Sequence, residues 1–203
     1  MLKDRFNEIT FEFDKKKILV IGDLMLDTYL WGHSERISPE APVPIVQVNK
    51  VEHNLGGAAN VALNLSSLGC EVFLIGTIGS DPEGEILKNL LNQSNIDFTP
   101  LVEFDSRPTT VKSRIISHDQ QVIRTDRELT HDLSDESNKE LQGLVSSIIN
   151  DVDGIILEDY NKGVLNAGSI SRIINLVKGT DKPIYVDPKE KNFDLYKNVR
   201  LFK

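Results

Sequence analysis

Residues 18–23 read Ile-Leu-Val-Ile-Gly-Asp, a run of four aliphatic residues that ends in a glycine and a carboxylate. Working outward from this stretch, three more short apolar runs share its design, at residues 72–75, 155–157 and 184–186. Apolar runs of this length are typical of strands buried on both faces, as in a parallel sheet. Each run is followed at once by a glycine or an acidic residue. The four runs therefore predict a mainly parallel sheet.

Helical patterns lie between these runs. Apolar residues recur at helical spacing from residue 58 onward, and Gly69 is expected to end that helix. Asp81 followed by Pro82 predicts the start of a second helix, and Ser134 predicts the start of a third. A last apolar stripe covers residues 170–177. Because strands alternate with helices, we expect an α/β fold.

Two segments differ from this pattern. Residues 43–51 and 109–128 alternate apolar and polar side chains, which is typical of half-exposed antiparallel strands. Residues 118–120, His-Asp-Gln, suit a hairpin turn. We expect these segments to form a small second sheet that projects from the α/β core.

Composition restricts the possible functions. The 203 residues include 31 acidic and 23 basic side chains, a net charge of −8, which argues against nucleic-acid binding. The sequence has neither an apolar run long enough to cross a membrane nor a signal peptide. Cys70 is the single cysteine, which excludes a disulfide framework, and the four histidines lack the spacing of a metal site. We expect a cytoplasmic protein without a resident metal.

Ligands of open α/β sheets bind outside the carboxyl ends of the strands. The residues that the sequence places at or near this edge are Asp23, Asp27, Glu158, Asp159, Asp187, Lys162 and Lys189. Carboxylates accept hydrogen bonds from hydroxyl groups and ammonium groups neutralise phosphate, so this edge suits a polar anionic ligand. For each acidic residue alone, a purely structural role in the turn after the strand is the open alternative.

Residues 56–60, Gly-Gly-Ala-Ala-Asn, open the first helix after an extended segment. Two glycines there allow a ligand to approach the backbone closely, and the helix start offers free N–H groups. The sequence contains neither the glycine fingerprint of dinucleotide-binding folds nor a P-loop. An NAD-dependent enzyme is therefore disfavoured.

In this order the motifs resemble those of the ribokinase-like (PfkB-type) carbohydrate kinases, most specifically the bacterial heptose-7-phosphate kinases of lipopolysaccharide precursor synthesis. The segments that carry the resemblance are residues 22–46, 56–79, 119–124, 159–163 and 187–189. The most diagnostic part is RISPEAPVPIV at 36–46. The resemblance implies a ribokinase-like αβα sandwich with a mainly parallel sheet and a small antiparallel β-sheet lid. Residues 1–203 would then be a single incomplete kinase domain, with the lid formed by about 28–51 and 108–128.

The resemblance also implies which residues bind the substrate. Those expected to bind sugar hydroxyls are Asp27, Gly56, Gly57 and Asn60. Those expected to line the floor of the site are Asp159, Lys162 and Lys189. The lid arginines, of which one or more would meet a phosphate, are Arg36, Arg114 and Arg124. The alternative for each arginine is an exposed charge on the lid, and Asp23 is expected to be structural or to act through a neighbour.

The implied reaction is transfer of the γ-phosphate of ATP, with Mg²⁺, to the C1 hydroxyl of D-glycero-D-manno-heptose 7-phosphate. The implied partner is a second copy, bound through the lid. Kinases of this family carry a late Gly-Ala-Gly-Asp motif whose aspartate is the general base, and the 203 residues contain no such motif. We therefore expect the catalytic base and the C-terminal portion of the fold beyond Lys203, and an inactive chain without them. The alternatives are a kinase for another sugar phosphate and a non-catalytic module for sugar-phosphate binding or dimerisation.

Overall fold

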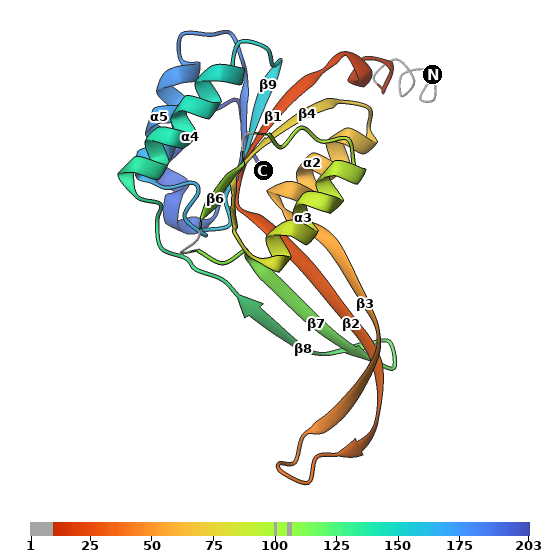
Figure 1. Cartoon of the computed structure of the whole chain (residues 1–203). Coiled ribbons are helices and arrows are strands. Elements are labelled where there is room, and N and C mark those ends of the chain that lie inside the picture. Colours follow the sequence, from red (N-terminus) through yellow and green to blue (C-terminus); the bar gives the residue numbers. More distant parts are fainter. Residues whose placement is uncertain (1–9, 100, 105–106) are drawn as a thin grey trace.

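The computed structural model describes residues 10–99, 101–104 and 107–203 (Figure 1). Its centre is a sheet of five parallel strands in the order β11-β10-β9-β1-β4. The strands are β1 (Lys17–Gly22), β4 (Glu71–Ile75), β9 (Gly154–Glu158), β10 (Ile184–Asp187) and β11 (Leu201–Phe202). The four predicted apolar runs are confirmed as β1, β4, β9 and β10.

Helices cover the sheet on both faces (Figure 1). They are α2 (Ala58–Ser67), α3 (Pro82–Gln93), α4 (Asp135–Ile148) and α5 (Ala167–Val177). Leu19 and Ile21 of β1 belong to the core beneath α4 and α5, whereas Val20 belongs to the core beneath α2 and α3. A strand with a helix layer on each side must be apolar at every position, which is the physical reason for the unbroken run at 18–21.

The expected helix starts are confirmed. The Asp81 carboxylate accepts the N–H of Gly84 and Pro82 is the first residue of α3. The Ser134 hydroxyl accepts the N–H of Ser137 at the start of α4. Helix α5 begins three residues before the apolar stripe at 170–177, because Asn166 and Ser169 form a capping box there.

Four strands form a second sheet that leaves the carboxyl edge of the first, in the order β3-β2-β7-β8 (Figure 1). They are β2 (Leu24–Ile37), β3 (Pro44–Gly57), β7 (Val111–Ser117) and β8 (Gln120–Arg127). We call these strands the projecting sheet. Strands β7 and β8 lie within the alternating segment at 109–128, β3 runs six residues beyond the segment at 43–51, and β2 lies outside both segments.

The expectation of a purely antiparallel lid is wrong for one strand pair. Strands β2 and β3 are antiparallel, as are β7 and β8, but β2 and β7 run parallel. The reason is that both strands start from the core and run outward, while β3 and β8 return. The turn between β7 and β8 is the expected hairpin, with His118 and Asp119 both at positive φ.

The remaining elements are short and belong to neither of these two sheets. Strands β5 (Thr77–Gly79) and β6 (Val102–Phe104) pair with each other in parallel. The two 3-10 helices are η1 (Phe13–Lys15) and η2 (Glu190–Leu195). The chain passes from β6 through residues 107–110 into β7, so this connection lies at the root of the projecting sheet.

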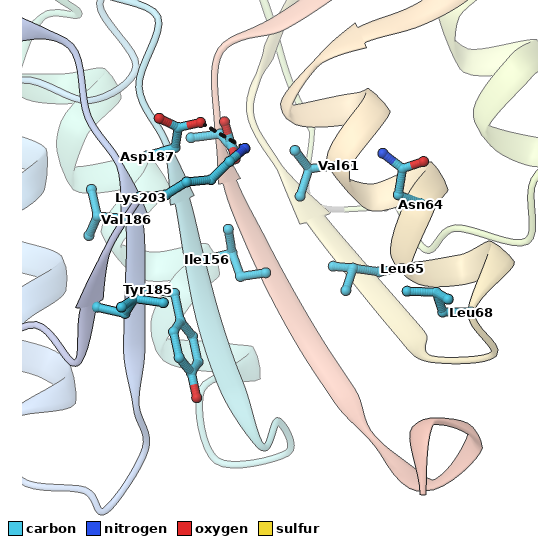
Figure 2. Close-up of a pocket in the computed structure, with 11 residues that line it drawn as sticks. Val61, Asn64, Leu65, Leu68, Ile156, Tyr185, Val186, Asp187 and Lys203 are labelled. Carbon is cyan, nitrogen blue, oxygen red and sulfur yellow. Dashed lines mark hydrogen bonds and ion pairs between the residues drawn. The ribbon is translucent and has the colours of Figure 1, made fainter. Parts of the chain in front are cut away.

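Strands β9 and β10 are not fully covered by α2, and a hollow remains between them. Val61 and Leu65 of α2, and Leu68 directly after it, lie across a hollow of about 370 Å³ from Ile156 and Tyr185 (Figure 2). The hollow is apolar along most of its length and carries acidic and basic groups at one end. Because residues of α2 line it, the hollow lies on the face of the sheet opposite α4 and α5.

Candidate functional site

The root of the projecting sheet gathers charged side chains in register. Asp27 on β2 pairs with Lys112 on β7, which pairs with Asp126 on β8. Residues in register lie on the same face of a sheet, so these three side chains form one row. Tyr29, Arg114 and Arg124 form the next row on that face. We call these two rows the polar face.

Asp27 and Arg114 form an ion pair within the polar face. The Arg114 Nη1 atom donates to Asp27 Oδ1 at 2.6 Å, and both side chains are about one-fifth exposed. This hydrogen bond is the main reason why the pKa of Arg114 is raised. The guanidinium also lies 5.2 Å from the centre of the Tyr29 ring. Two predicted site residues, 87 positions apart, are thus in direct contact.

Gly56 and Gly57 lie against this pair because β3 runs beside β2. A Cβ atom on Gly56 would lie 2.7 Å from Asp27 Oδ2, so only glycine leaves room for the carboxylate. Gly57 has φ +56°, and a Cβ atom there would lie 2.3 Å from the carbonyl oxygen of Asp23. The start of α2 follows directly, and Asn60 is exposed in its first turn. The predicted hydroxyl-binding residues therefore lie together.

Lys162 reaches the same place from the loop after β9. Its Nζ atom lies 2.6 Å from Glu128 Oε1, and Glu128 Oε2 lies 3.4 Å from Lys112 Nζ. Lys112 also contacts Asp126 at 3.0 Å, which is the main reason why the pKa of Asp126 is lowered. Carboxylates and ammonium groups thus alternate from the loop to the polar face.

Lys112, Asp126 and Glu128 are site residues that the sequence analysis missed. The alternation of β7 contains a signal for Lys112, because it is two positions from Arg114 and shares its face. No local pattern marks Glu128, which follows the end of β8 and contacts Lys162 only through the fold.

The other two predicted lid arginines form no hydrogen bond or ion pair with Asp27 among the described residues. Arg124 is on the polar face but is exposed, with its Nε atom 2.9 Å from Asp126. Arg36 lies nine residues beyond Asp27 on β2, roughly 30 Å along an extended strand. It lines a hollow near the end of the projecting sheet together with His33 and Gln47.

The remaining predicted residues lie in the loops after β9 and β10. Asp159 is 1% exposed, and its carboxylate accepts hydrogen bonds from Asn192 Nδ2 and Tyr196 Oη at 2.8 and 2.7 Å. Lys189 is exposed, with its Nζ atom 5.0 Å from the centre of the Tyr160 ring. Among the described residues, Lys189 forms no hydrogen bond or ion pair with Lys162 or with Glu128.

Glu158 and Asp187 end the neighbouring strands β9 and β10 in register. Glu158 is buried, and its Oε2 atom has no hydrogen-bond partner among the described residues. Burial, followed by the Asp187 carboxylate, raises the pKa of Glu158 to about 7. Asp187 in turn contacts Lys203 Nζ at 3.2 Å, at the polar end of the hollow in Figure 2.

The described residues, which omit 1–9, 100 and 105–106, contain no group of three or more histidine, cysteine or acidic side chains that could hold a metal ion. They also contain no helix that is long and apolar enough to cross a membrane.

The structure thus combines a three-layered α/β core with a cluster of charged side chains at the root of the projecting sheet. The family model described as "pfkB family carbohydrate kinase" matches residues 15–200. The chain therefore belongs to the pfkB family of carbohydrate kinases.

Curated relatives agree with this family. The chain is 47% identical over 186 residues to the "Bifunctional protein HldE" of Helicobacter pylori (strain P12), which covers 92% of this chain and 40% of that protein. It is 45% identical over 183 residues to the HldE of Aliarcobacter butzleri, covering 90% of this chain and 38% of that protein. The chain thus spans about 40% of the length of these relatives.

Solved structures share the fold. A carbohydrate kinase from Agrobacterium tumefaciens has a TM-score of 0.65 at 24% identity, covering 84% of this chain and 53% of that one. The tetrameric inhibited form of phosphofructokinase-2 from Escherichia coli has a TM-score of 0.70 at 17% identity, with 92% and 60% coverage. An Arabidopsis thaliana ribokinase complexed with ribose and ATP has a TM-score of 0.61 at 14% identity, with 85% and 53% coverage.

Proposed function

We propose that this chain forms the sugar-phosphate-binding part of an ATP-dependent heptose-7-phosphate kinase. The reaction is transfer of the γ-phosphate of ATP to the C1 hydroxyl of D-glycero-D-manno-heptose 7-phosphate, in the cytoplasmic synthesis of lipopolysaccharide precursors. The observation that supports it best is the Asp27–Arg114 ion pair beside Gly56, in a chain 47% identical to a protein named HldE.

The polar face provides what a sugar phosphate requires. Asp27 has a second carboxylate oxygen, Oδ2, next to the bare Cα of Gly56, and a carboxylate accepts hydrogen bonds from two hydroxyl groups. We assign the sugar hydroxyls to Asp27, the Gly56–Gly57 backbone and Asn60. Asp159, whose carboxylate is bonded within the chain, supports the loop that carries Lys162.

The cations near Asp27 suit the phosphate of the substrate. Lys112, Arg114 and Lys162 each hold a carboxylate partner within 3.0 Å, and Arg124 lies at the open side of the same face. A phosphate provides the same charge-assisted contacts as a carboxylate, so it can replace one partner without leaving a cation unpaired. Arg36 lies too far out along β2 to act on the same sugar within one chain, and we assign Arg36 and Lys189 to the rim of the site.

ATP and Mg²⁺ are proposed for the whole enzyme rather than for residues of this chain. No carboxylate cluster of the described residues suits a metal ion, and the sequence has no glycine-rich phosphate loop. We therefore assign neither group to a residue here and derive no step through them.

Isothermal titration calorimetry with the 203-residue chain tests the binding step. We expect D-glycero-D-manno-heptose 7-phosphate to bind at least tenfold more tightly than fructose 6-phosphate or ribose. Asp27→Asn should weaken binding at least tenfold, because it removes a charge-assisted contact that contributes about 1.5–3 kcal/mol. Asp135→Asn, on the exposed start of α4, is the matched control and should bind like the wild type.

A coupled ADP-release assay on the protein expressed from its complete reading frame tests the reaction. Turnover of the heptose phosphate supports the proposal. Turnover of fructose 6-phosphate instead would replace the substrate, and tight binding without any turnover would favour the non-catalytic binding module.

A further inference from the structure

The loop from Asp159 to Val164 is held from below by a buried carboxylate. Asp23, between β1 and β2, is 1% exposed and accepts the backbone N–H groups of Tyr160, Lys162 and Val164 at 2.9, 3.0 and 3.2 Å. Burial raises the pKa of this carboxyl, and the three hydrogen bonds partly offset the rise. Three donors to one carboxylate fix the course of the loop backbone.

A buried guanidinium holds the same loop from another direction. Arg107, in the connection between β6 and β7, is 7% exposed. It donates hydrogen bonds to the carbonyl oxygens of Leu129 at 2.9 Å, His131 at 3.1 Å and Lys162. Lys162 is therefore held through its N–H by Asp23 and through its carbonyl by Arg107. The carboxylates that face the guanidinium are Asp23 and Asp132.

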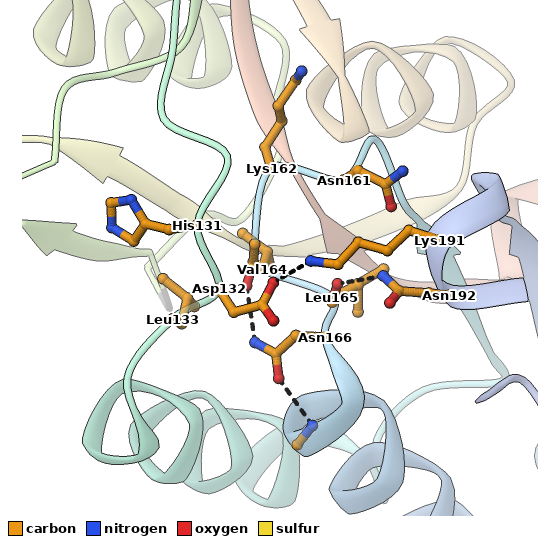
Figure 3. A network of polar contacts seen from close by, with 12 residues as sticks. His131, Asp132, Leu133, Asn161, Lys162, Val164, Leu165, Asn166, Lys191 and Asn192 are labelled. Atoms are coloured by element: carbon orange, nitrogen blue, oxygen red, sulfur yellow. Dashed lines mark hydrogen bonds and ion pairs between the residues drawn. The ribbon is translucent and has the colours of Figure 1, made fainter.

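Figure 3 shows the surroundings of this loop. Residues 131–133 pass on one side of the segment from Asn161 to Asn166, and η2 lies on the other. Asp132 pairs with Lys191 of η2 at 2.7 Å, and the Lys162 side chain points away from these contacts. Hydrogen bonds thus fix the backbone of the loop, while the ammonium group of Lys162 extends to the site, where it pairs with Glu128.

The contacts of Arg107 determine one distance in the site. It binds the carbonyl of Lys162 and that of Leu129, the residue next to Glu128. These two segments carry the partners of the Lys162–Glu128 ion pair, which measures 2.6 Å. One guanidinium therefore holds together the two backbones from which this pair projects.

We propose that Arg107 is a positioning residue for the proposed sugar-phosphate site, which it serves by fixing Lys162 against Glu128 at the root of the projecting sheet. This inference rests on the proposed function. Arginine is required because its planar fork reaches three carbonyl groups at once, whereas lysine is a single point charge. Asp23 supplies the opposite charge that the buried guanidinium needs.

A double-mutant cycle separates positioning from general stability. Arg107→Lys keeps the charge, and we expect it to weaken heptose 7-phosphate binding at least tenfold. In a Lys162→Ala background the same change should weaken binding less than threefold, because the group that Arg107 positions is gone. Arg172→Lys is the matched control, since Arg172 joins α4 and α5 away from the site, and it should stay within twofold of the wild type. Equal losses in both backgrounds would refute positioning through Lys162, as would wild-type affinity in Arg107→Lys.

Amide hydrogen exchange of residues 159–164 needs no ligand. We expect Arg107→Lys to speed exchange in this loop at least tenfold, and unchanged exchange would contradict the proposal. If the wild type fails to bind the sugar phosphate, the proposed function fails while the exchange result still decides the role of Arg107. If Arg107→Lys does not fold, ¹⁵N-arginine spectra of the wild type replace it. Slowly exchanging, separate guanidinium signals for Arg107 support the proposal, and a single averaged signal opposes it.

Discussion

Position 56 has room for a hydrogen atom but not for a methyl group. The Cβ atom of an alanine would lie 2.7 Å from Asp27 Oδ2, closer than Cβ atoms come to other atoms without a shift, and 3.1 Å from its Cγ, which is also tight. Either the carboxylate or the β3 backbone must move. The geometry of the Asp27–Arg114 pair therefore depends on a residue that has no side chain.

We predict that Gly56→Ala weakens sugar-phosphate binding at least tenfold, measured by calorimetry. Gly143→Ala is the control, because a Cβ atom at position 143 meets nothing within 4 Å. Since Gly143 lies inside α4, its replacement should stabilise the protein by about 0.5–1 kcal/mol and leave binding unchanged. If Gly56→Ala binds the sugar phosphate with wild-type affinity, Asp27 does not take part in binding.

Glu158 makes the stability of the protein depend on pH. The native state binds its proton up to about pH 7, whereas the unfolded state releases it near 4.5. The native state therefore loses stability as the pH rises between these values, and the loss is complete above 7. The charges that face Glu158 are Asp187, Lys189 and Lys203.

We predict that Glu158→Gln abolishes this dependence. At pH 8 the variant should exceed the wild type in unfolding free energy by on the order of 3 kcal/mol, and at pH 4.5 the two should be nearly equal. Thermal unfolding at pH 4.5, 6, 7 and 8 measures the effect. If the unfolding free energy of the wild type does not change across this pH range, ionisation of Glu158 does not destabilise the native state.

Among the secondary-structure elements, helix α3 is linked to the root of the projecting sheet by one side chain, that of Asp81. The Asp81 carboxylate caps α3 through Gly84, and it also accepts the N–H and hydroxyl of Thr109 at 3.0 and 2.6 Å. Arg127, at the end of β8, reaches the same carboxylate at 3.2 Å. A single cap thus joins a core helix to the connection that leads into β7 and to the end of β8.

We predict that Asp81→Ala destabilises the protein by about 2–3 kcal/mol, because it removes a helix cap and leaves the buried N–H of Thr109 without its partner. Ser134→Ala is the comparison, because Ser134 caps α4 through Ser137 alone. It should cost about 1 kcal/mol. Urea denaturation measures both, and equal losses would mean that Asp81 serves α3 only.

At the scale of the whole molecule, the projecting sheet has a second face. Val51, Leu30, Ile115 and Ile123 pair in register across β3, β2, β7 and β8, and therefore form one apolar row. Their positions alternate with the polar face, so they point away from the site. Val51 and Ile123 are each 51% exposed, and a contiguous exposed apolar row is typical of an interface.

We propose that this row joins two copies of the chain, and predict that Val51→Lys with Ile123→Lys converts a dimer to a monomer. Light scattering coupled to size-exclusion chromatography measures the mass. Leu68→Lys is the control, because Leu68 is 52% exposed at the end of α2. It should leave the dimer intact, and a monomeric wild type at micromolar concentration would refute the proposal.

The sequence by itself determined the core of this protein. Strands that are buried on both faces require unbroken apolar runs. The runs at 18–21, 72–75, 155–157 and 184–186 therefore predict β1, β4, β9 and β10. The helix starts at Asp81 and Ser134 are equally local, because a cap bonds to an N–H only three residues away. The family resemblance added Asp27 and Arg114, which the structure places in contact.

Only the tertiary structure decided how the site is assembled. Arg107 meets Lys162 across 55 residues and Asp23 meets it across 139, and Glu128 joins the site from the end of a strand. The parallel pairing of β2 and β7 arises in the same way, since both strands leave the core in one direction. Local patterns record what a residue buries and caps, whereas contacts between distant segments depend on how the two sheets meet.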